Sequence, residues 1–208
     1  MADARVPVIA TLGIADGFPG AHGVMPLLAQ TDLAEWLGPA WTRMLRRQAK
    51  RWLPPGLPDV EAARQNVRAL HSHGVVLLAG ADAPNPVLIP GASLHRELRH
   101  LVLAGLGPCE ALAAAASLPA SVFGLSDRKA IRPGLRADLV LVPGRPDRDI
   151  SATQDIAAVW KQGVAVDLDS YVGSTEESVS VAALQATNDK IVAAIAQMWP
   201  PPLSGRCR

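Results

Sequence analysis

Residues 75–87 read VVLLAGADAPNPV, an apolar run followed by a glycine, a carboxylate and a proline-rich turn. Uninterrupted Val and Leu residues are typical of a parallel strand that is covered on both faces. Pro84 and Pro86 break the extended pattern, so Asp82 is expected at the carboxyl end of this strand. In parallel α/β proteins, that end of the strands carries the chemistry. Asp82 is therefore the first candidate for a functional residue, the alternative being a carboxylate that only caps the loop.

Upstream of this strand, the sequence alternates between strand and helix patterns. Residues 6–12 (VPVIATL) predict a buried strand, and residues 13–23 predict a glycine-rich loop. A helical pattern covers residues 26–53. A further helix is expected between Asp59 and Gly74, which suit the positions that flank a helix. The apolar face of that helix consists of Val60, Ala63, Val67 and Leu70.

Downstream of the carboxylate, two more helices are expected. Ser93 suits the N-cap of a helix over residues 94–104, and Pro108 suits the first position of an alanine-rich helix that runs to about residue 116. Cys109 lies in that second helix and is expected to be a small core residue. The succession of strands and helices up to this point indicates parallel βα units.

The pattern changes after residue 131. Residues 137–142 predict a strand that stops at a Pro-Gly pair, and residues 157–161 and 164–166 predict two further strands. Gln162-Gly163 between them is a hairpin signal. One more amphipathic helix is expected over residues 178–199. The fold class is therefore α/β, with a small antiparallel piece appended to the βα region.

The composition limits the classes of partner and compartment. The chain has 208 residues, is 49% hydrophobic and carries a net charge of +1, so a sizeable core can form and no strong charge excess attracts nucleic acid or membrane. The basic cluster at residues 43–51 fits a solvent-facing side of a helix. Two cysteines make no disulfide framework, and residues 1–10 do not resemble a signal peptide. We therefore expect a cytoplasmic protein that binds neither nucleic acid nor membrane.

Three pieces of sequence occur in a fixed order across about a hundred residues, from Asn66 to about Asp167. They are GADAP at residues 80–84, SLHRELRHLVLAGLGPCEAL at residues 93–112, and PGLRADLV at residues 133–140 with VWKQG at residues 159–163. Together they resemble the C-terminal half of the metal-dependent amidohydrolase superfamily, and the imidazolonepropionase-related branch in particular. The family usually has Gly-Thr-Asp-Ala-Pro in the first piece, so Ala81 stands where a threonine is usual.

The resemblance implies a (β/α)8 barrel with a small β-sandwich built from both chain ends. This chain would hold the last two βα units of the barrel, part of the β-sandwich and a C-terminal helix. The implied boundaries are residues 1–130 for the barrel part, 131–172 for the sandwich part, and 173–208 for the helix and a disordered tail.

The resemblance also implies roles for individual residues. Asp82 matches the aspartate that closes strand 8, which helps to hold a divalent metal, zinc above all, or takes a proton from metal-bound water. The family's other metal ligands would lie upstream of strand 7 and are missing here. His22, His95 and Asn85 lie on the same side of the sheet as the aspartate and could line a small-molecule substrate pocket. Otherwise both histidines are ordinary polar residues.

The other polar residues are interpreted as structural. His71-Ser72-His73 looks like a metal-binding His-x-His, but it ends a helix about 20–30 Å of extended chain away from the aspartate loop. Arg96 and Glu97 are expected to be a solvent-facing helix pair, and Asp138 is expected to tether the turn before its strand.

Two interpretations of function stay open. In the first, the chain is the C-terminal portion of a metal-dependent hydrolase of C–N bonds other than peptide bonds. The missing strands would then come from upstream sequence, from a complementing chain or from a homo-oligomer. In the second, it is a truncated, non-catalytic remnant or an interaction subunit. On both interpretations the isolated chain is expected to show no turnover, because most metal ligands of the family are missing from it.

Overall fold

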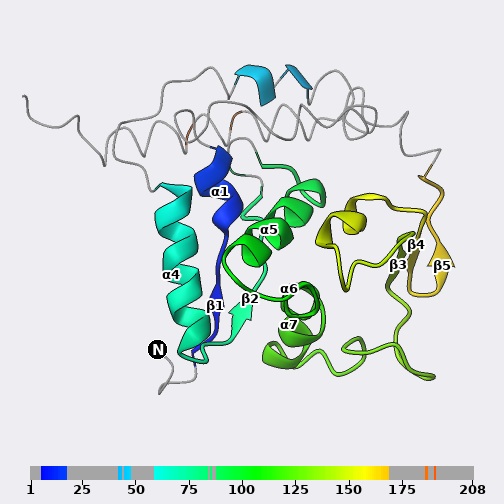
Figure 1. The fold of residues 1–208 in the computed structure, drawn as a ribbon. Coiled ribbons are helices and arrows are strands. Elements are labelled where there is room, and N and C mark those ends of the chain that lie inside the picture. Colours follow the sequence, from blue (N-terminus) through cyan, green and yellow to red (C-terminus); the bar gives the residue numbers. More distant parts are fainter. Residues whose placement is uncertain are drawn as a thin grey trace, which may run out of the picture.

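A computed structural model describes the central part of the chain, namely residues 6–17, 42–43, 45–47, 59–83, 85, 88–168, 186 and 190. Figure 1 shows a parallel strand pair with its helices and, beyond helices α5 and α6, a separate antiparallel sheet. The elements in chain order are β1 (Val8–Ile9), α1 (Leu12–Gly17), α4 (Val60–Ser72), β2 (Leu77–Leu78), α5 (Ala92–Leu103), α6 (Pro108–Ala115), α7 (Ser117–Val122), β3 (Leu139–Leu141), the 3-10 helix η1 (Ile150–Gln154), β4 (Ala158–Lys161) and β5 (Val164–Ala165).

Strands β1 and β2 form the parallel pair that the two apolar runs predict. Val8 pairs with Leu77 and Ile9 with Leu78, so both strands end at the same edge of the sheet. Leu77 and Leu78 are buried, whereas Ile9 and Val76 stay 50% and 40% exposed. The prediction of a strand covered on both faces therefore holds only in part, because the face that carries Ile9 and Val76 is half open.

The apolar core lies between this strand pair and helices α4, α5 and α6. Leu77 from β2 packs there with Leu101 and Ala104 from α5, and α6 adds two alanines that are fully buried. The small alanine side chains allow the helices to approach the sheet closely. The remaining members of the core are Leu12, Val67, Leu98, Leu106 and Ile150.

Local signals explain where the helices begin and end. Asp59 caps α4, its side chain accepting a hydrogen bond from the Glu61 backbone N–H, and Gly74 follows the helix with a φ of +72° that glycine adopts readily. Pro108 opens α6 at its first position, where no backbone N–H is needed. These three predictions are confirmed.

Three local predictions are wrong. Residues 12–17 form helix α1 immediately after β1, where the glycines predicted a loop. Helix α5 begins at Ala92 after Gly91, and Ser93 is buried in its first turn with its hydroxyl accepting a hydrogen bond from the Ile89 N–H at 2.8 Å. Cys109 is exposed, because the first turn of α6 turns this position away from the core.

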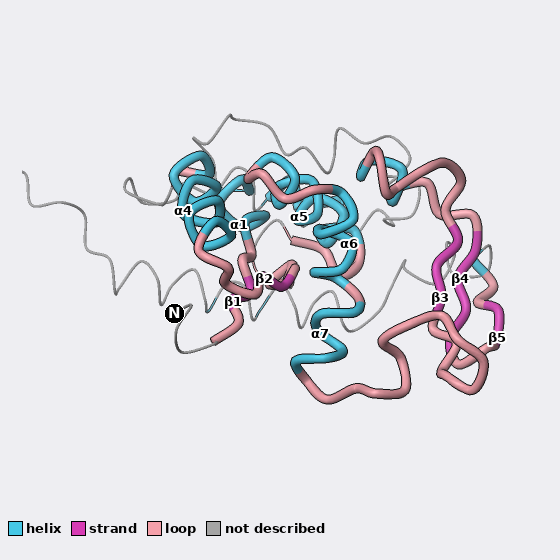
Figure 2. Tube along the Cα trace, turned by 60° about the horizontal axis from the view of Figure 1, so that its bottom comes forward, coloured by secondary structure: helices cyan, strands magenta, loops and turns pink. Residues whose placement is uncertain are grey.

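The antiparallel sheet has the strand order β3-β4-β5. Gln162 and Gly163 join β4 to β5 with φ values of +54° and +81°, the left-handed backbone that a tight hairpin turn requires. The sequence predicted that Asp138 tethers the turn before its own strand, whereas its Oδ1 accepts a hydrogen bond from the Gln162 N–H at 2.8 Å and so tethers the β4–β5 turn. The 3-10 helix η1 packs against α5 and α6 and links this sheet to the rest of the molecule (Figure 2).

Several predictions fall outside the described residues. They are His22, most of the helical pattern over residues 26–53, Cys207, and the helix over residues 178–199 apart from two of its positions. Within the described part of the chain, no helix is long and apolar enough to cross a membrane.

Candidate functional site

Asp82 lies beyond the carboxyl end of β2, as the sequence predicts. It is exposed and adopts a left-handed backbone with a φ of +54°, which aspartate tolerates better than most residues. Asn85 stabilises this turn, because its backbone N–H and its Nδ2 both donate to the Asp82 carbonyl oxygen, at 3.1 and 2.9 Å. The carboxylate is thus presented to solvent at the strand end by a turn with its own hydrogen bonds.

The neighbouring strand ends close to this turn. Thr11 follows β1 and has a φ of +47°, a strained value for a β-branched residue. Gly80 precedes the aspartate and leaves no room for a side chain, since a Cβ there would lie 2.4 Å from Ile9 Cγ2 and 3.4 Å from Thr11 Cγ2. The ends of β1 and β2 therefore meet at one edge, each with a left-handed residue that is not glycine.

Helix α5 holds the backbone after β1 through two buried charged residues. Glu97 Oε2 accepts a hydrogen bond from the Gly13 N–H at 2.8 Å, and Arg96 Nη2 donates to the Gly13 carbonyl oxygen at 2.6 Å. Glu97 is 0% and Arg96 7% exposed. The prediction of a solvent-facing pair is therefore wrong: α1, which was not predicted, covers this side of α5.

Burial changes the acid–base behaviour of this pair. Desolvation raises the pKa of Glu97 to about 7, and the hydrogen bonds from Gly13 and Leu12 and the charge of Arg96 oppose that rise only in part. Desolvation also lowers the pKa of Arg96. Glu97 Oε1 and Arg96 Nε have no hydrogen-bond partner within the described part of the chain. Burying this charged pair costs free energy of folding that apolar side chains at the same positions would not cost.

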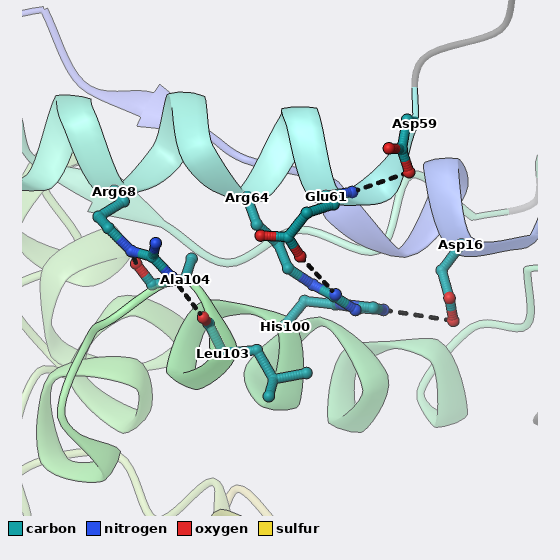
Figure 3. A network of polar contacts seen from close by, with 8 residues as sticks. All are labelled: Asp16, Asp59, Glu61, Arg64, Arg68, His100, Leu103 and Ala104. Atoms are coloured by element: carbon teal, nitrogen blue, oxygen red, sulfur yellow. Dashed lines mark hydrogen bonds and ion pairs between the residues drawn. The ribbon is translucent and has the colours of Figure 1, made fainter.

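A second polar cluster, in which His100 is buried and Arg64 and Asp16 are partly buried, joins α1, α4 and α5 (Figure 3). Arg64 donates through Nε to His100 Nδ1 at 3.2 Å, and His100 Nε2 lies 3.4 Å from Asp16 Oδ2. Because a guanidinium can only donate, Nδ1 accepts and the neutral ring carries its proton on Nε2, facing the carboxylate. The contact with His100 holds the pKa of Asp16 below its usual range.

Sequence reasoning missed this group because its members lie far apart in the chain. His100 follows the recognisable SLHREL pattern by two positions, at the i+4 spacing from Arg96 that places both on one side of α5. That spacing was the available signal. Further along the same helix pair, Arg68 donates to the carbonyl oxygens of Leu103 and Ala104 at 3.1 and 3.2 Å and so satisfies the end of α5 (Figure 3).

The predicted site residues that the structure describes lie on different elements. Asn85 lies in the Asp82 turn, but the half-buried His95 contacts η1, with Nδ1 3.1 Å from Thr153 Oγ1, and burial lowers its pKa. His71 and His73 lie at the end of α4, as predicted, where the second contacts the Ala69 carbonyl oxygen.

In the described part of the chain, Asp82 belongs to no group of three or more possible metal ligands. Among those residues, no three His, Cys, Asp or Glu side chains come close enough together to hold one ion. A hydrolytic zinc centre takes about three protein ligands. The described residues thus do not fit a complete metal site, and Asp82 is a single candidate ligand.

Comparison with known proteins adds three matches, although no protein-family profile matches the chain. An adenine deaminase from Ligilactobacillus salivarius is 34% identical over 87 residues, which are 42% of this chain and 15% of that protein. An imidazolonepropionase from Deinococcus deserti is 36% identical over 103 residues, which are 48% of this chain and 26% of that protein. A solved structure of bottromycin amidohydrolase superposes with a TM-score of 0.56 and 26% identity over 84% of this chain and 39% of that one.

The chain resembles the amidohydrolase superfamily. The sequence and structure comparisons agree with the resemblance that the three sequence pieces carry. They confirm an α/β fold that corresponds to part of the amidohydrolase fold. The chain spans 15% and 26% of the two curated relatives and 39% of the solved amidohydrolase chain. The likeness to amidohydrolases therefore concerns a part of their fold, and the described residues contain no closed barrel.

Proposed function

We propose that this chain forms part of an amidohydrolase that cleaves C–N bonds other than peptide bonds in a small molecule, with Asp82 as the proton acceptor for the attacking water. The position of Asp82 supports this best. It is exposed at the carboxyl edge of a parallel strand pair, within the GADAP piece that resembles the superfamily motif. A general base must reach the water that attacks, and a carboxylate on a strand-end turn is placed for that task.

The names of the two curated relatives support the reaction class. One is an adenine deaminase and the other an imidazolonepropionase. A deaminase removes an amino group from a carbon atom, which is a hydrolysis of a C–N bond outside a peptide. The substrate of this chain is proposed only at the level of that class.

The proposal includes the rest of a barrel. Strands β1 and β2 would be its last two strands, and residues 131–172 would belong to a small β-sandwich. Ile9 and Val76 on the half-open face of β1 and β2 support a further covering layer, because parallel strands are normally buried on both sides. The remaining strands would come from further sequence of the same protein, from a complementing chain or from a second copy of this one, in a cytoplasmic assembly.

The metal belongs to the proposal as well. A divalent ion, zinc above all, would supply Lewis-acid chemistry when bound, and Asp82 would face it as a ligand or as the neighbouring base. Since the described residues supply a single candidate ligand, its other ligands would come from elsewhere. What this chain contributes by itself is the placed carboxylate and the turn that Asn85 holds.

The decisive experiment removes the Asp82 carboxylate in the native assembly. The chain would be tagged at its own genomic locus, purified with what it binds, and assayed on cyclic amides and aminopurines with added zinc. Asp82→Asn should lower kcat at least about 100-fold, the usual range for loss of a general base. Asp127→Asn removes an exposed carboxylate from the loop after α7 and should leave kcat unchanged.

Two outcomes would contradict the proposal. Full activity of Asp82→Asn would remove Asp82 from the reaction. No hydrolysis by any assembly that contains the chain would favour the other candidate, a non-catalytic interaction subunit. The contact of His95, a predicted pocket residue, with Thr153 in η1 is the observation that favours this second candidate.

A further inference from the structure

We propose that Arg96 and Glu97 are positioning residues for the strand-end site: they hold the backbone after β1 so that Thr11 is kept beside the Asp82 turn. This inference rests on the proposed function for the meaning of the site, but its geometric part stands independently. It assigns a role to two residues that a recognisable motif contains and that neither packing nor the proposed chemistry explains.

The first step is the strain at Thr11. A left-handed backbone costs a residue with a Cβ atom roughly 1–2 kcal/mol, and β-branched residues suffer most. Such a conformation persists only where the surroundings enforce it, and it is concentrated at functional sites. Thr11 has this conformation at φ +47° directly at the end of β1, and its Cγ2 faces Gly80, two residues before Asp82. Something must hold Thr11 there.

The second step is the restraint. Gly13 lies two residues after Thr11, and α5 holds both of its backbone groups, the N–H by Glu97 and the carbonyl oxygen by Arg96. Hydrogen bonds to both the N–H and the carbonyl oxygen of one residue fix its position and its orientation. A Cβ at Gly13 would lie 3.6 Å from Arg96 Nε and 3.7 Å from Glu97 Oε2, so the two side chains close around it. The backbone leaving β1 therefore cannot relax without breaking these bonds.

The third step is the cost of the arrangement. A helix can be packed with apolar residues alone, and α1 already buries Leu12 and Ala15. Burying a carboxyl and a guanidinium beside them, each with an unpartnered atom among the described residues, lowers stability relative to an apolar pair of the same size. Such an arrangement fits a requirement for placement rather than for stability.

The test measures geometry by NMR in the full chain. Glu97→Met removes the acceptor for the Gly13 N–H at nearly constant volume, and Arg96→Met removes the donor to its carbonyl. Both should speed hydrogen exchange of the Gly13 amide at least tenfold, abolish the left-handed backbone shifts of Thr11, and weaken the NOE between the Thr11 methyl and Gly80. Glu97→Gln keeps an acceptor oxygen and should preserve all three signals.

The matched control is Glu110→Met. Glu110 accepts a hydrogen bond from the Gly107 N–H at 2.7 Å, so the same type of bond is lost at the start of α6, away from the strand ends. Its effect should be confined to residues near Gly107 and near His71, whose Nε2 lies 3.4 Å from Glu110 Oε1. If Glu97→Met does not fold, Arg96→Met, which leaves Glu97 in place, carries the same test.

The outcomes separate this inference from the proposed function. Unchanged Thr11 and Gly80 signals in the Met variants, with only a lower stability, would overturn the positioning role. In an active assembly, Arg96→Met should lower kcat about tenfold to a hundredfold with little change in KM, because a misplaced site loses rate rather than affinity. An inactive assembly together with altered Thr11 signals would overturn the proposed function and leave the restraint established.

Discussion

Two regions of the molecule use the same hydrogen bond in opposite surroundings. In α1, the Gly13 N–H donates a hydrogen bond to a carboxylate oxygen of Glu97 at 2.8 Å. In the β4–β5 turn, the Gln162 N–H donates to a carboxylate oxygen of Asp138, also at 2.8 Å. Burial raises the pKa of Glu97 to about 7, whereas the bond from Gln162, followed by the nearby Arg136, holds the pKa of Asp138 below its usual range.

The difference shows that the surroundings, and not the hydrogen bond, decide how a carboxylate behaves. Asp138 lies at the surface with Arg136 at 2.7 Å and Lys161 at 3.6 Å, so water and two cations stabilise its charge. Glu97 has the cation of Arg96 on the preceding residue but no access to water. We therefore expect the buried carboxyl to respond to pH in the neutral range and the surface carboxylate to respond to salt.

The largest expected effect is the pH dependence of stability that Glu97 causes. Its pKa in the folded protein lies above the ordinary value of 4.5, so the folded state binds the proton more tightly than the unfolded state does. The contribution of Glu97 to the free energy of unfolding should be fully present below pH 4.5 and fall by roughly 3 kcal/mol as the pH rises through 7. Urea unfolding at a series of pH values checks this, and Glu97→Gln should flatten the curve.

The window matters because Asp16 acts in the opposite direction. Its pKa is lowered, so its contribution is present at higher pH and is lost only in more acidic solution. Between pH 4.5 and 7 the slope reports Glu97 together with His95, whose lowered pKa makes its own contribution rise with pH. The difference between the wild-type and Glu97→Gln curves isolates the contribution of Glu97. Parallel curves for the wild type and Glu97→Gln would mean that the carboxyl is not buried as described.

The second expected effect concerns the backbone strain at Thr11, which the hydrogen bonds of Arg96 and Glu97 with Gly13 enforce. Thr11→Gly should raise the free energy of unfolding by about 0.5–1 kcal/mol, because glycine adopts a positive φ without steric cost and loses part of that gain through its freer unfolded chain. Ala10→Gly, in the same strand segment with no such strain, should lower stability instead. Equal losses in both variants would argue against strain at Thr11. Thermal unfolding of the two variants side by side distinguishes these cases.

The smallest expected effect lies in the surface region. Asp138→Asn keeps an oxygen for the Gln162 N–H and removes the attraction to Arg136 and Lys161. Ion pairs that water can reach contribute little and are screened by salt. The unfolding midpoint should change slightly at low ionic strength and not at all in high salt. A large, salt-independent loss would show that this carboxylate is as critical as the buried one.

Much of the framework could be predicted from short-range patterns. The two apolar runs predicted the parallel pair, Asp59 and Pro108 marked helix starts, and Gln162-Gly163 marked the hairpin. These signals are local, because the residues that carry them are neighbours in the chain. The place of Asp82 after β2 follows from the same kind of signal.

The surroundings of the site could not be predicted in the same way. Arg96 and Glu97 looked exposed because charged residues on a helix usually are, and the short helix that covers them begins with glycine-rich residues that predict a loop. His100 gained its role from Arg64 and Asp16, which lie 36 and 84 positions earlier in the chain. Contacts between distant segments decide such cases, and a single sequence does not display them.

The Gly80 position has a consequence for how the aspartate motif works as a unit. Even a methyl group at position 80 would collide with Ile9. The ends of β1 and β2 can therefore lie this close together only because residue 80 has no side chain. A side chain at position 80 would push the two strand ends apart and so increase the distance between Thr11 and Asp82. Within one short motif, the glycine thus sets the spacing of the two strand ends, and the aspartate supplies a negative charge beside them.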